Sequence, residues 1–551
     1  MLTPSLPKND PDLVKRQDLL RRQKQVYIYD SVNGITLVKD LPTHENFSIS
    51  YQVMRGKGFS ALIANGVATR VENIFDPFDK LEDYEELFPI LPKPTSIKTW
   101  QSNTSFAYQR LAGANPMVIR GISSLPNNFP VSDAIFQKAM GPDKTIASEA
   151  AKGNLFLADY APLHHLTLGS YQRGMKTVTA PLVLFCWRAR GLRGQGGLVP
   201  VAIQLYQDPT LPNQRIYTPD DGLNWLMAKI FVQIADGNHH ELVSHLSHTH
   251  LVAEAFVLAT ATELALNHPL AILLRPHFQF TLAINSLAES ELINPGGFVD
   301  RLLAGTLEAS IEIIKTSYRQ RLDNFADYTL PKQLAFRQVD DTSLLPDYPY
   351  RDDALLLWQA TETYVKDYLS LYYTSDADVN EDTELQAWVR KLMSPEGGGI
   401  KKLVSDGELD TLAKLVEVVT QIIFVAGPQH AAVNYPQYDY LAFSPNIPLA
   451  GYQSPPKAAE EVDIDYILRL LPPQAQAAYQ LEIMQTLTAF QFNRFGYPSR
   501  SAFPDQRAYP ILAVFQAKLK AIENEIDRRN LTRFTPYIFL KPSRIPNSIN
   551  I

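Results

Sequence analysis

The chain has 551 residues, of which 45% are apolar and 20% charged, and its formal net charge is −7. These proportions are those of a soluble globular protein with a large core. The acidic balance gives no electrostatic reason to expect nucleic acid as a partner. The single cysteine, Cys186, excludes an internal disulfide and any metal site built from several thiolates.

The N-terminal part of the chain, residues 1–94, is mixed in character. Residues 11–29 are predicted to form a helix, and the runs 27–29 and 35–38 are β-like. The sequence shows neither the apolar core of a signal peptide nor a stretch of ~20 apolar residues, so we expect a cytoplasmic protein. The helix carries a basic cluster, which leaves two alternatives: peripheral contact with an anionic membrane, or docking on the protein body. This cluster consists of Lys15, Arg16, Arg21, Arg22 and Lys24.

A small β-sheet is predicted in the first half of the chain. Residues 76–145 are rich in Pro, Asn and Asp and are expected to be loop-dominated and partly helical. Strand-like apolar runs follow at 155–157, 181–187 and 198–206. The glycine-rich segment 191–197 lacks the spacing of a phosphate-binding loop, so we interpret it as a hairpin loop.

From Asn224 onward, long helical periodicities dominate the sequence. They run through 224–263, 269–291, 298–318, 353–374, 383–393, 408–427, 475–492 and 509–529. The predicted fold class is therefore mainly α, a large helical body with a small β-sheet subdomain.

Histidines are concentrated in one short segment: five of the 11 lie within the twelve residues 239–250. The apolar flanks indicate a buried helix, and buried imidazoles need partners, which a metal ion would supply. HELVSH is one residue too long for the zinc-protease pattern HExxH. His245 and His250 are five residues apart, which in an ideal α-helix separates them by roughly 140°. An inserted π-turn brings such residues together, so the spacing predicts a π-bulge at a functional site.

Two further features of the sequence point to buried polar groups. His430 and Asn434 are four residues apart and therefore share one helix face. The last residue, Ile551, is aliphatic, whereas chain ends usually fray into solvent. An apolar end is expected to be tucked inside the protein, where its carboxylate would need a cation.

Together these motifs resemble those of the lipoxygenase family. The matching segments keep their order and approximate spacing, and they are 225–229, 235–236, 240–250, 267–270, 275–277, 284–288, 429–434 and 544–551. The resemblance implies a helical lipoxygenase catalytic domain with a small β-sheet subdomain over residues 95–551. Residues 1–94 are then an N-terminal helical or mixed extension. Because that extension is short and partly helical, we expect the N-terminal β-barrel domain of many eukaryotic members to be absent, as in a bacterial-type form.

The resemblance also implies the cofactor and the reaction. The cofactor is one non-haem iron, alternating between Fe2+ and Fe3+, with His245, His250, His430, Asn434 and the α-carboxylate of Ile551 as ligands. Fe(III)–OH would abstract hydrogen from a (1Z,4Z)-pentadiene of linoleate, linolenate or arachidonate. Insertion of O2 would then be regio- and stereospecific and give a fatty-acid hydroperoxide. No side chain acts as a catalytic base or nucleophile beyond the metal-bound hydroxide.

Other residues match family positions around the metal and the substrate. Glu241 and Gln437 match positions that link the metal to the substrate pocket. For Glu241 the alternative is an ordinary acidic residue on the surface of a helix. Ala288, Leu292 and Val299 match the substrate and O2 pocket, with core packing as the alternative for the last two. The remaining histidines are not expected to bind the metal: structural roles are expected for His248, His268 and His277, and no role is assigned to His164, His165, His239 and His240.

Three alternatives to an iron lipoxygenase stay open at this point. Manganese accepts the same ligand types, and a zinc hydrolase could use the same histidines, although it lacks an evident general base. A non-catalytic helical scaffold would leave the histidines without a chemical role. We expect the protein to act as a monomer on a polyunsaturated fatty acid and O2.

Overall fold

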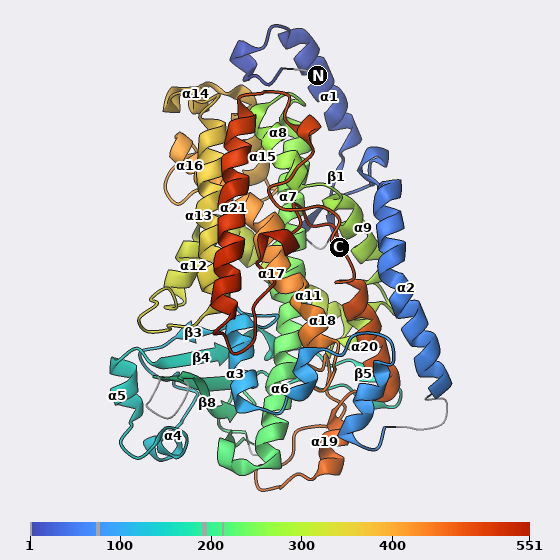
Figure 1. Ribbon diagram of the computed structural model, residues 1–551, viewed down its shortest axis with the longest axis vertical. Coiled ribbons are helices and arrows are strands. Elements are labelled where there is room, and N and C mark those ends of the chain that lie inside the picture. The colour runs from blue at the N-terminus through green and yellow to red at the C-terminus, as the bar shows by residue number, and fades with distance from the viewer. Residues whose placement is uncertain (1–2, 33, 73–77, 190–195, 212–213) are drawn as a thin grey trace.

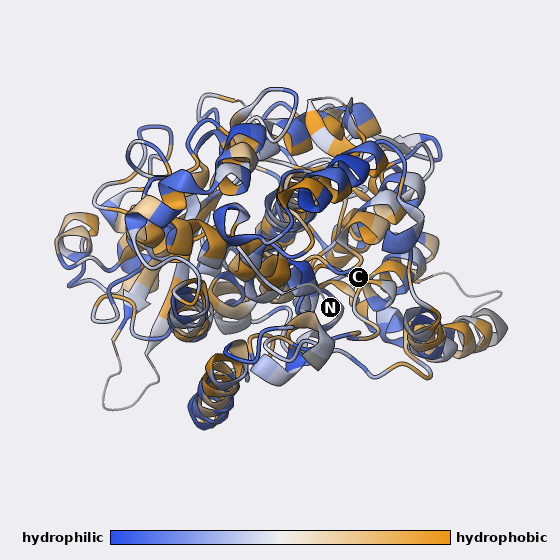
Figure 2. Cartoon of the chain, turned by 90° about the horizontal axis from the view of Figure 1, so that it is seen from above, coloured by the Kyte–Doolittle hydropathy of each residue, from blue (hydrophilic) through white to orange (hydrophobic). Residues whose placement is uncertain are grey.

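The computed structural model describes residues 3–32, 34–72, 78–189, 196–211 and 214–551. Long helices run along the long axis of the molecule, and a small sheet lies near one end of it (Figure 1). Seen from above, the outer helices carry both hydrophilic and hydrophobic residues, as expected of helices that pack by one face (Figure 2). The predicted fold class, mainly α with a small sheet, is confirmed.

The N-terminal part consists of a helix, a hairpin and a second helix. Helix α1 (Leu13–Val26) follows Asp12, whose side chain accepts a hydrogen bond from the backbone N–H of Lys15. Strands β1 (Tyr29–Val32) and β2 (Ile35–Val38) pair antiparallel. The 24-residue helix α2 (Ile49–Glu72) was not predicted. Its glycines weaken helix propensity, and its apolar residues do not line one buried face, so its periodicity is obscured.

Helix α1 is tied to the helical body by ion pairs. The guanidinium of Arg16 donates to the carboxylates of Glu384 at 2.6 Å and Asp10 at 2.7 Å, and this cluster is buried. Lys24 donates to Glu263 at 2.5 Å. These contacts favour docking of α1 on the protein body, the second of the two alternatives. The division of the chain at residues 94 and 95 stays a prediction.

The predicted sheet has the strand order β3-β4-β7-β8-β9, and every neighbouring pair is antiparallel. Its strands are β3 (Arg120–Gly121), β4 (Leu155–Asp159), β7 (Leu182–Arg188), β8 (Gly197–Gln204) and β9 (Ile216–Tyr217). Strands β5 (Ser170–Tyr171) and β6 (Gly174–Met175) form a separate pair. Most of the predicted hairpin loop 191–197 lies outside the described residues. Cys186 is buried in β7, and burial raises its pKa to about 12, as expected of a structural thiol.

The helical body follows the predicted periodicities closely. Two predicted stretches are broken. The stretch 269–291 is broken at Pro276 into α8 (Pro269–Leu274) and α9 (Thr281–Glu291), because a proline disfavours a continuous helix. The stretch 298–318 is interrupted after Leu302, and its second helix begins at Leu307. The other helices that cover predicted stretches are α10 (Phe298–Leu302), α11 (Leu307–Asp323), α13 (Pro349–Leu369), α15 (Thr383–Met393), α20 (Gln474–Thr486) and α21 (Ala508–Asn530). Shorter helices join them: α3 (Asn103–Ala112), α4 (Asp133–Met140), α5 (Ile146–Ala151), α12 (Leu330–Phe336), α14 (Asp376–Glu381), α18 (Pro436–Leu441) and α19 (Ile464–Leu470).

One helical stretch, 412–441, is long and apolar enough to cross a membrane by length and composition. The prediction that the chain contains no stretch of this length and apolarity was therefore wrong. However, 78% of its most apolar window is buried inside the protein. Burial of this kind is typical of a central core helix.

Candidate metal centre

A π-helix brings the first two histidines together. Helix α6 (Leu223–His239) continues directly into the π-helix η7 (His240–Leu251) and then into α7 (Val252–Glu263). The wider turn of a π-helix places residues i and i+5 on the same side, which a regular α-helix does not. The π-bulge predicted from the spacing of His245 and His250 is confirmed.

A second long helical stretch carries the third histidine, His430. Helix α16 (Leu412–Phe424) continues through the π-helical segment η10 (Val425–Gln429) into α17 (His430–Asn434). Pro428 lies inside η10, where its missing N–H and its ring are incompatible with regular α-helical bonding. The widened turn therefore has a cause in the sequence, and α17 packs against η7.

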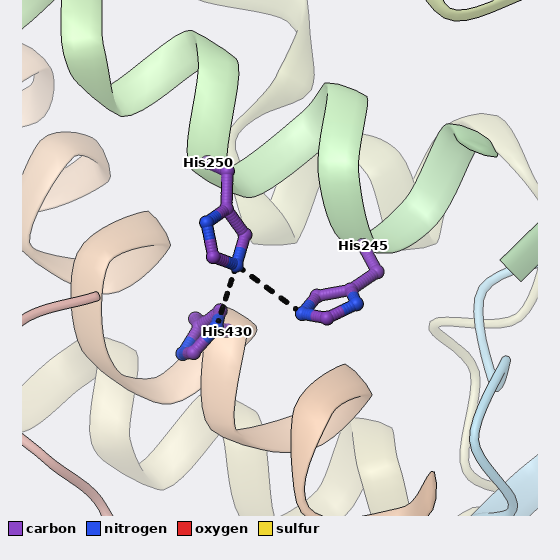
Figure 3. A group of neighbouring side chains, drawn as sticks. All are labelled: His245, His250 and His430. Carbon is purple, nitrogen blue, oxygen red and sulfur yellow. Dashed lines mark hydrogen bonds between the residues drawn. The ribbon is translucent and has the colours of Figure 1, made fainter. Parts of the chain in front are cut away.

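The three imidazoles point their Nε2 atoms at one another (Figure 3). The Nε2 atom of His250 lies 3.3 Å from Nε2 of His245 and 3.1 Å from Nε2 of His430. Two nitrogens that each lie ~2.1 Å from one metal ion are ~3.0 Å apart at a right angle and ~3.4 Å apart at a tetrahedral angle. Both distances fall in this range, and the ligand nitrogens of all three histidines lie within 4.8 Å of one another, as expected of a group that can hold one ion.

The protonation states also suit a metal. Burial and the neighbouring His245 lower the pKa of His250 to about 3. Burial lowers the pKa of His430 well below its ordinary value, and it lowers the pKa of His245 despite the nearby carboxylate of Glu241. The three rings are thus neutral near pH 7, which is the form that binds metals. A nitrogen donor set without thiolate fits iron or manganese.

The comparisons with known proteins agree with this site. A family model described as Lipoxygenase matches residues 71–535. The chain belongs to the lipoxygenase family. A linoleate 9/13-lipoxygenase of Pseudomonas aeruginosa is 38% identical over 492 residues, which cover 86% of this chain and 70% of that protein. A human polyunsaturated fatty acid lipoxygenase is 33% identical over 556 residues, which cover 98% of this chain and 80% of that protein.

Solved lipoxygenase structures share the whole fold. A lipoxygenase crystallised anaerobically in complex with arachidonate superposes with a TM-score of 0.93 at 32% identity, covering 100% of this chain and 84% of that one. A coral 8R-lipoxygenase gives a TM-score of 0.91 at 33% identity, covering 100% and 83%. The chain is therefore a lipoxygenase in fold and family, and an enzyme that acts on polyunsaturated fatty acids.

The orientation of one lipoxygenase histidine is fixed by an amide. Asn285 of α9 accepts a hydrogen bond from Nδ1 of His250 at 2.9 Å and donates to the backbone oxygen of His250 at 3.0 Å. Its amide also donates to Glu254 at 2.7 Å, and Glu254 accepts from the backbone N–H of Val38 in β2 at 2.8 Å. Because Nδ1 is the donor, Nε2 keeps its lone pair for a metal. Burial raises the pKa of Glu254 to about 7.

We predict that Asn285→Leu weakens metal binding by about 10- to 100-fold, the usual cost of losing a partner that orients a ligand. The imidazole of His250 would then be free to rotate or to change tautomer. The affinity can be measured by chelator competition. The exposed Ser290→Ala on the same helix serves as the control and should bind metal like the wild type. Equal affinities for Asn285→Leu and the wild type would contradict the role of this amide.

Glu241, interpreted as a link between metal and pocket, is buried inside the histidine cluster. Its carboxylate lies 3.3 Å from Nδ1 of His240 and 3.6 Å from Nδ1 of His245. Burial alone would raise the pKa of Glu241, but the contacts with His240 and His245 outweigh burial and lower it to about 2. A surface position for Glu241 is thereby excluded, since the residue is 5% exposed.

Asn434 and Gln437 form a buried pair one turn beyond His430. The amide of Gln437 donates to Oδ1 of Asn434 at 3.0 Å, and the amide of Asn434 donates to the backbone oxygen of Leu487 at 2.8 Å. Both side chains are fully buried. This arrangement orients the Asn434 oxygen, which agrees with a weak ligand held by a neighbour.

The last residues of the chain are buried and held by side chains from three regions. Tyr51 of α2 donates to the backbone oxygen of Asn550 at 2.7 Å, and His277 bonds the backbone oxygen of Asn547 at 2.9 Å. Asn493 accepts from the backbone N–H of Asn547 at 2.8 Å. Ile551 is 4% exposed, so the expectation of a tucked-in end is confirmed, while its role as a ligand stays a prediction.

Ala288 lines a small cavity of about 110 Å³ beside the metal centre. The cavity is bounded mainly by aliphatic side chains of η7, of α11, of the β1–β2 hairpin and of the segment after α9: Val32, Ile35, Leu37, Leu246, Leu251, Ile293, Ile311 and Ile314. Leu292 and Val299 are absent from the described lining. The backbone N–H of Val299 donates to the oxygen of Leu292, and Val299 belongs to the core, so their pocket role stays a prediction.

The other histidines have structural partners within the part of the chain that the structure describes. His248 contacts Ser317, His268 contacts Asp382 and His277 contacts Asn547, in agreement with the structural roles expected for them. Sequence reasoning assigned no role to His240, which bonds the backbone oxygen of Val433 and pairs with Glu241. It also missed Asn285 and Glu254. The only signal for Asn285 was its place in a family segment, and nothing local marked Glu254.

Proposed function

We propose that this lipoxygenase inserts O2 into a (1Z,4Z)-pentadiene of a polyunsaturated fatty acid with the help of one iron ion. The proposed ligands are His245, His250, His430, Asn434 and the α-carboxylate of Ile551. The observation that supports the proposal best is the convergence of three neutral, buried Nε2 atoms, 3.1 and 3.3 Å apart. When bound, iron supplies the one-electron redox chemistry that breaking a bis-allylic C–H bond requires.

The chain's own residues would hold and shield the centre. Asn285 and Glu241 orient two of the imidazoles, and Gln437 orients Asn434. The aliphatic cavity at Ala288 gives an apolar, water-poor place beside the metal for the reacting part of the fatty acid or for O2. No side-chain base is needed, and Glu241 is already engaged by two histidines. This engagement disfavours the zinc hydrolase alternative.

Metal analysis combined with oxygen uptake tests this proposal. We expect about one iron per chain, a ferric signal after addition of a fatty-acid hydroperoxide, and O2 uptake with linoleate or arachidonate that yields chiral hydroperoxides. Manganese in place of iron, with normal O2 uptake, would select the manganese alternative. Stoichiometric zinc without O2 uptake would overturn the proposal.

Relatives named hydroperoxide isomerase make the oxygen measurement essential. Proteins of that name from rat, mouse and human are each 34% identical to this chain, which covers 66–69% of their length. Conversion of an added hydroperoxide without O2 uptake from linoleate would assign this chain to that activity instead.

A further inference from the structure

A pocket of about 820 Å³ lies between η7, α11 and α12. This volume is that of a typical ligand site, ~300–1,000 Å³. Val243 and His248 of η7 line the pocket, whereas Leu246 and Leu251 of η7 line the Ala288 cavity. No described residue lines both. The pocket is therefore separate from the cavity beside the metal centre.

Arg321 of α11 lines this pocket, which we call the Arg321 pocket. The residue is 2% exposed, and its Nη1 donates to the backbone oxygen of Tyr328 at 3.2 Å. Its Nε and Nη2 have no hydrogen-bond partner, and no carboxylate lies within ion-pair distance, among the residues that the structure describes. Burial lowers the pKa of Arg321 to about 10. A buried cation of this kind is costly unless an anion joins it.

The two unpartnered nitrogens of Arg321 form one edge of the guanidinium group. This edge binds a carboxylate through two parallel hydrogen bonds. The same edge is filled in Arg16, whose Nε and Nη2 donate to the two carboxylate oxygens of Glu384 at 2.6 and 2.8 Å. Arg321 therefore offers the groups for such a pair, and the described part of the chain supplies no acid to complete it.

Two further groups belong to the same end of the pocket. Tyr350 of α13 is 2% exposed, and its hydroxyl makes no hydrogen bond to any described residue. Arg337 also lines the pocket, and its Nη1 donates to the backbone oxygen of Ile119 and to the hydroxyl of Tyr348. Burial raises the pKa of Tyr350, and the positive charges of Arg337 and Arg321 oppose this effect. The three groups thus lie near one another.

The acidic side chains of the pocket pair with cations outside it. Asp159 lies 3.6 Å from Arg120, and Glu312 lies 3.1 Å from Lys315. Neither acid forms an ion pair with the two guanidinium groups of the pocket. The positive charge of Arg321 and Arg337 is therefore not neutralised from within the pocket.

Much of the remaining wall is apolar. Phe336 is 81% exposed, so it lies where the pocket opens to solvent. The wall also includes Leu166, Val243, Ile313, Leu330 and Phe424. A ligand with an anionic head and a long apolar tail matches both parts of the pocket.

We propose that the Arg321 pocket binds a long-chain carboxylate at a site separate from the metal centre. The carboxylate would take the free edge of Arg321 beside the hydroxyl of Tyr350 and the charge of Arg337, and the tail would lie along the apolar wall. A small inorganic anion would satisfy the cations but leave this wall bare. The proposal goes beyond the assigned reaction, because a fatty acid that cannot be oxygenated carries the same two parts.

Equilibrium dialysis of the full-length protein with oleate tests the proposal. Oleate has a single double bond and no bis-allylic CH2, so it is not consumed. We expect Arg321→Met to lower the affinity of one oleate site by about 10- to 100-fold, the usual effect of losing hydrogen bonds to a charged group. Oleate bound near the metal would be the same in both proteins. A hydroxylated fatty acid of the same length assigns the site to oxidised chains if it binds more tightly than oleate, and to unoxidised chains if it does not.

Arg319→Met is the matched control. Arg319 is also on α11 but lies outside the pocket lining, and its partner Asp323 keeps a second cation, Lys401. This variant should bind oleate like the wild type. Tyr350→Phe removes only a hydroxyl without a hydrogen-bond partner in the described structure, so it should fold normally and lower oleate affinity by about fivefold.

Methyl oleate separates recognition of the carboxylate from collapse of the pocket. It keeps the tail but carries no charge, so it should bind the wild type and Arg321→Met equally. A loss of methyl oleate binding in Arg321→Met, or unchanged oleate binding in that variant, would overturn the proposal. Acetate binding as tight as oleate binding would do so too, because the apolar wall would then take no part. These readouts measure binding rather than turnover, so failure here is distinct from failure of the assigned reaction.

Discussion

Replacing His430 with alanine is expected to leave the protein folded but without its metal, and to abolish oxygenation of linoleate. His430 is fully buried and provides one of the three converging nitrogens, so its loss leaves an incomplete ligand set. Loss of a partner that only orients a ligand costs about 10- to 100-fold, so loss of the ligand itself should reduce turnover by at least ~10³-fold. Metal content per chain and O2 uptake are the measurements.

His248→Ala is the matched control for this experiment. His248 lies on η7, the π-helix that carries His245 and His250, but it contacts Ser317 rather than the cluster. We expect His248→Ala to keep its metal and most of its turnover, and circular dichroism should show both variants folded. Full metal content in His430→Ala would remove His430 from the ligand set.

Deletion of Ile551 is expected to have an effect of similar size. The new terminal carboxylate, on Asn550, would sit about 3.8 Å further back along the chain, the spacing of consecutive Cα atoms. The backbone oxygen of Asn550 is already held by Tyr51, so the shortened end is not free to move forward. We expect turnover to fall by at least ~10³-fold while the unfolding midpoint changes little, since only one terminal side chain is lost.

Ile551→Val separates the carboxylate from the side chain. Valine keeps the terminal carboxylate in place and removes one methylene, so turnover should stay within a few-fold of the wild type. Addition of one glycine after Ile551 converts that carboxylate into an amide and should be as damaging as the deletion. Normal O2 uptake by the extended or the shortened chain would exclude the terminal carboxylate as a ligand.

Much of the metal centre could be predicted because its signals are local. The five-residue interval between His245 and His250 is incompatible with one face of an α-helix, and this incompatibility itself predicted the π-helix. The pair His430 and Asn434 follows the ordinary i, i+4 rule. The main helices and the three longer strands were predicted for the same reason, since each is long and strongly periodic.

The features that sequence reasoning missed depend on contacts between distant segments. Asn285 is 35 residues from His250, and Glu254 reaches the backbone of Val38 across 216 residues. Hydrophobic periodicity carries no information about such pairings. Helix α2 was missed for a different reason: part of its apolar face points outward, so it lacks the inward stripe by which helices are recognised.

The hydrogen bond from Val38 to Glu254 connects the N-terminal part of the chain to the buried residues that surround the metal centre. A protein trimmed to residues 95–551 would lose that donor, the guanidinium of Arg16 that neutralises Glu384, and three aliphatic walls of the Ala288 cavity. The buried carboxylates of Glu254 and Glu384 would each lose a partner, and Glu254 is connected to His250 through the amide of Asn285. Residues 1–94 thus support the surroundings of the metal centre from inside the protein, and their removal should weaken metal binding even where the helices of residues 95–551 stay folded.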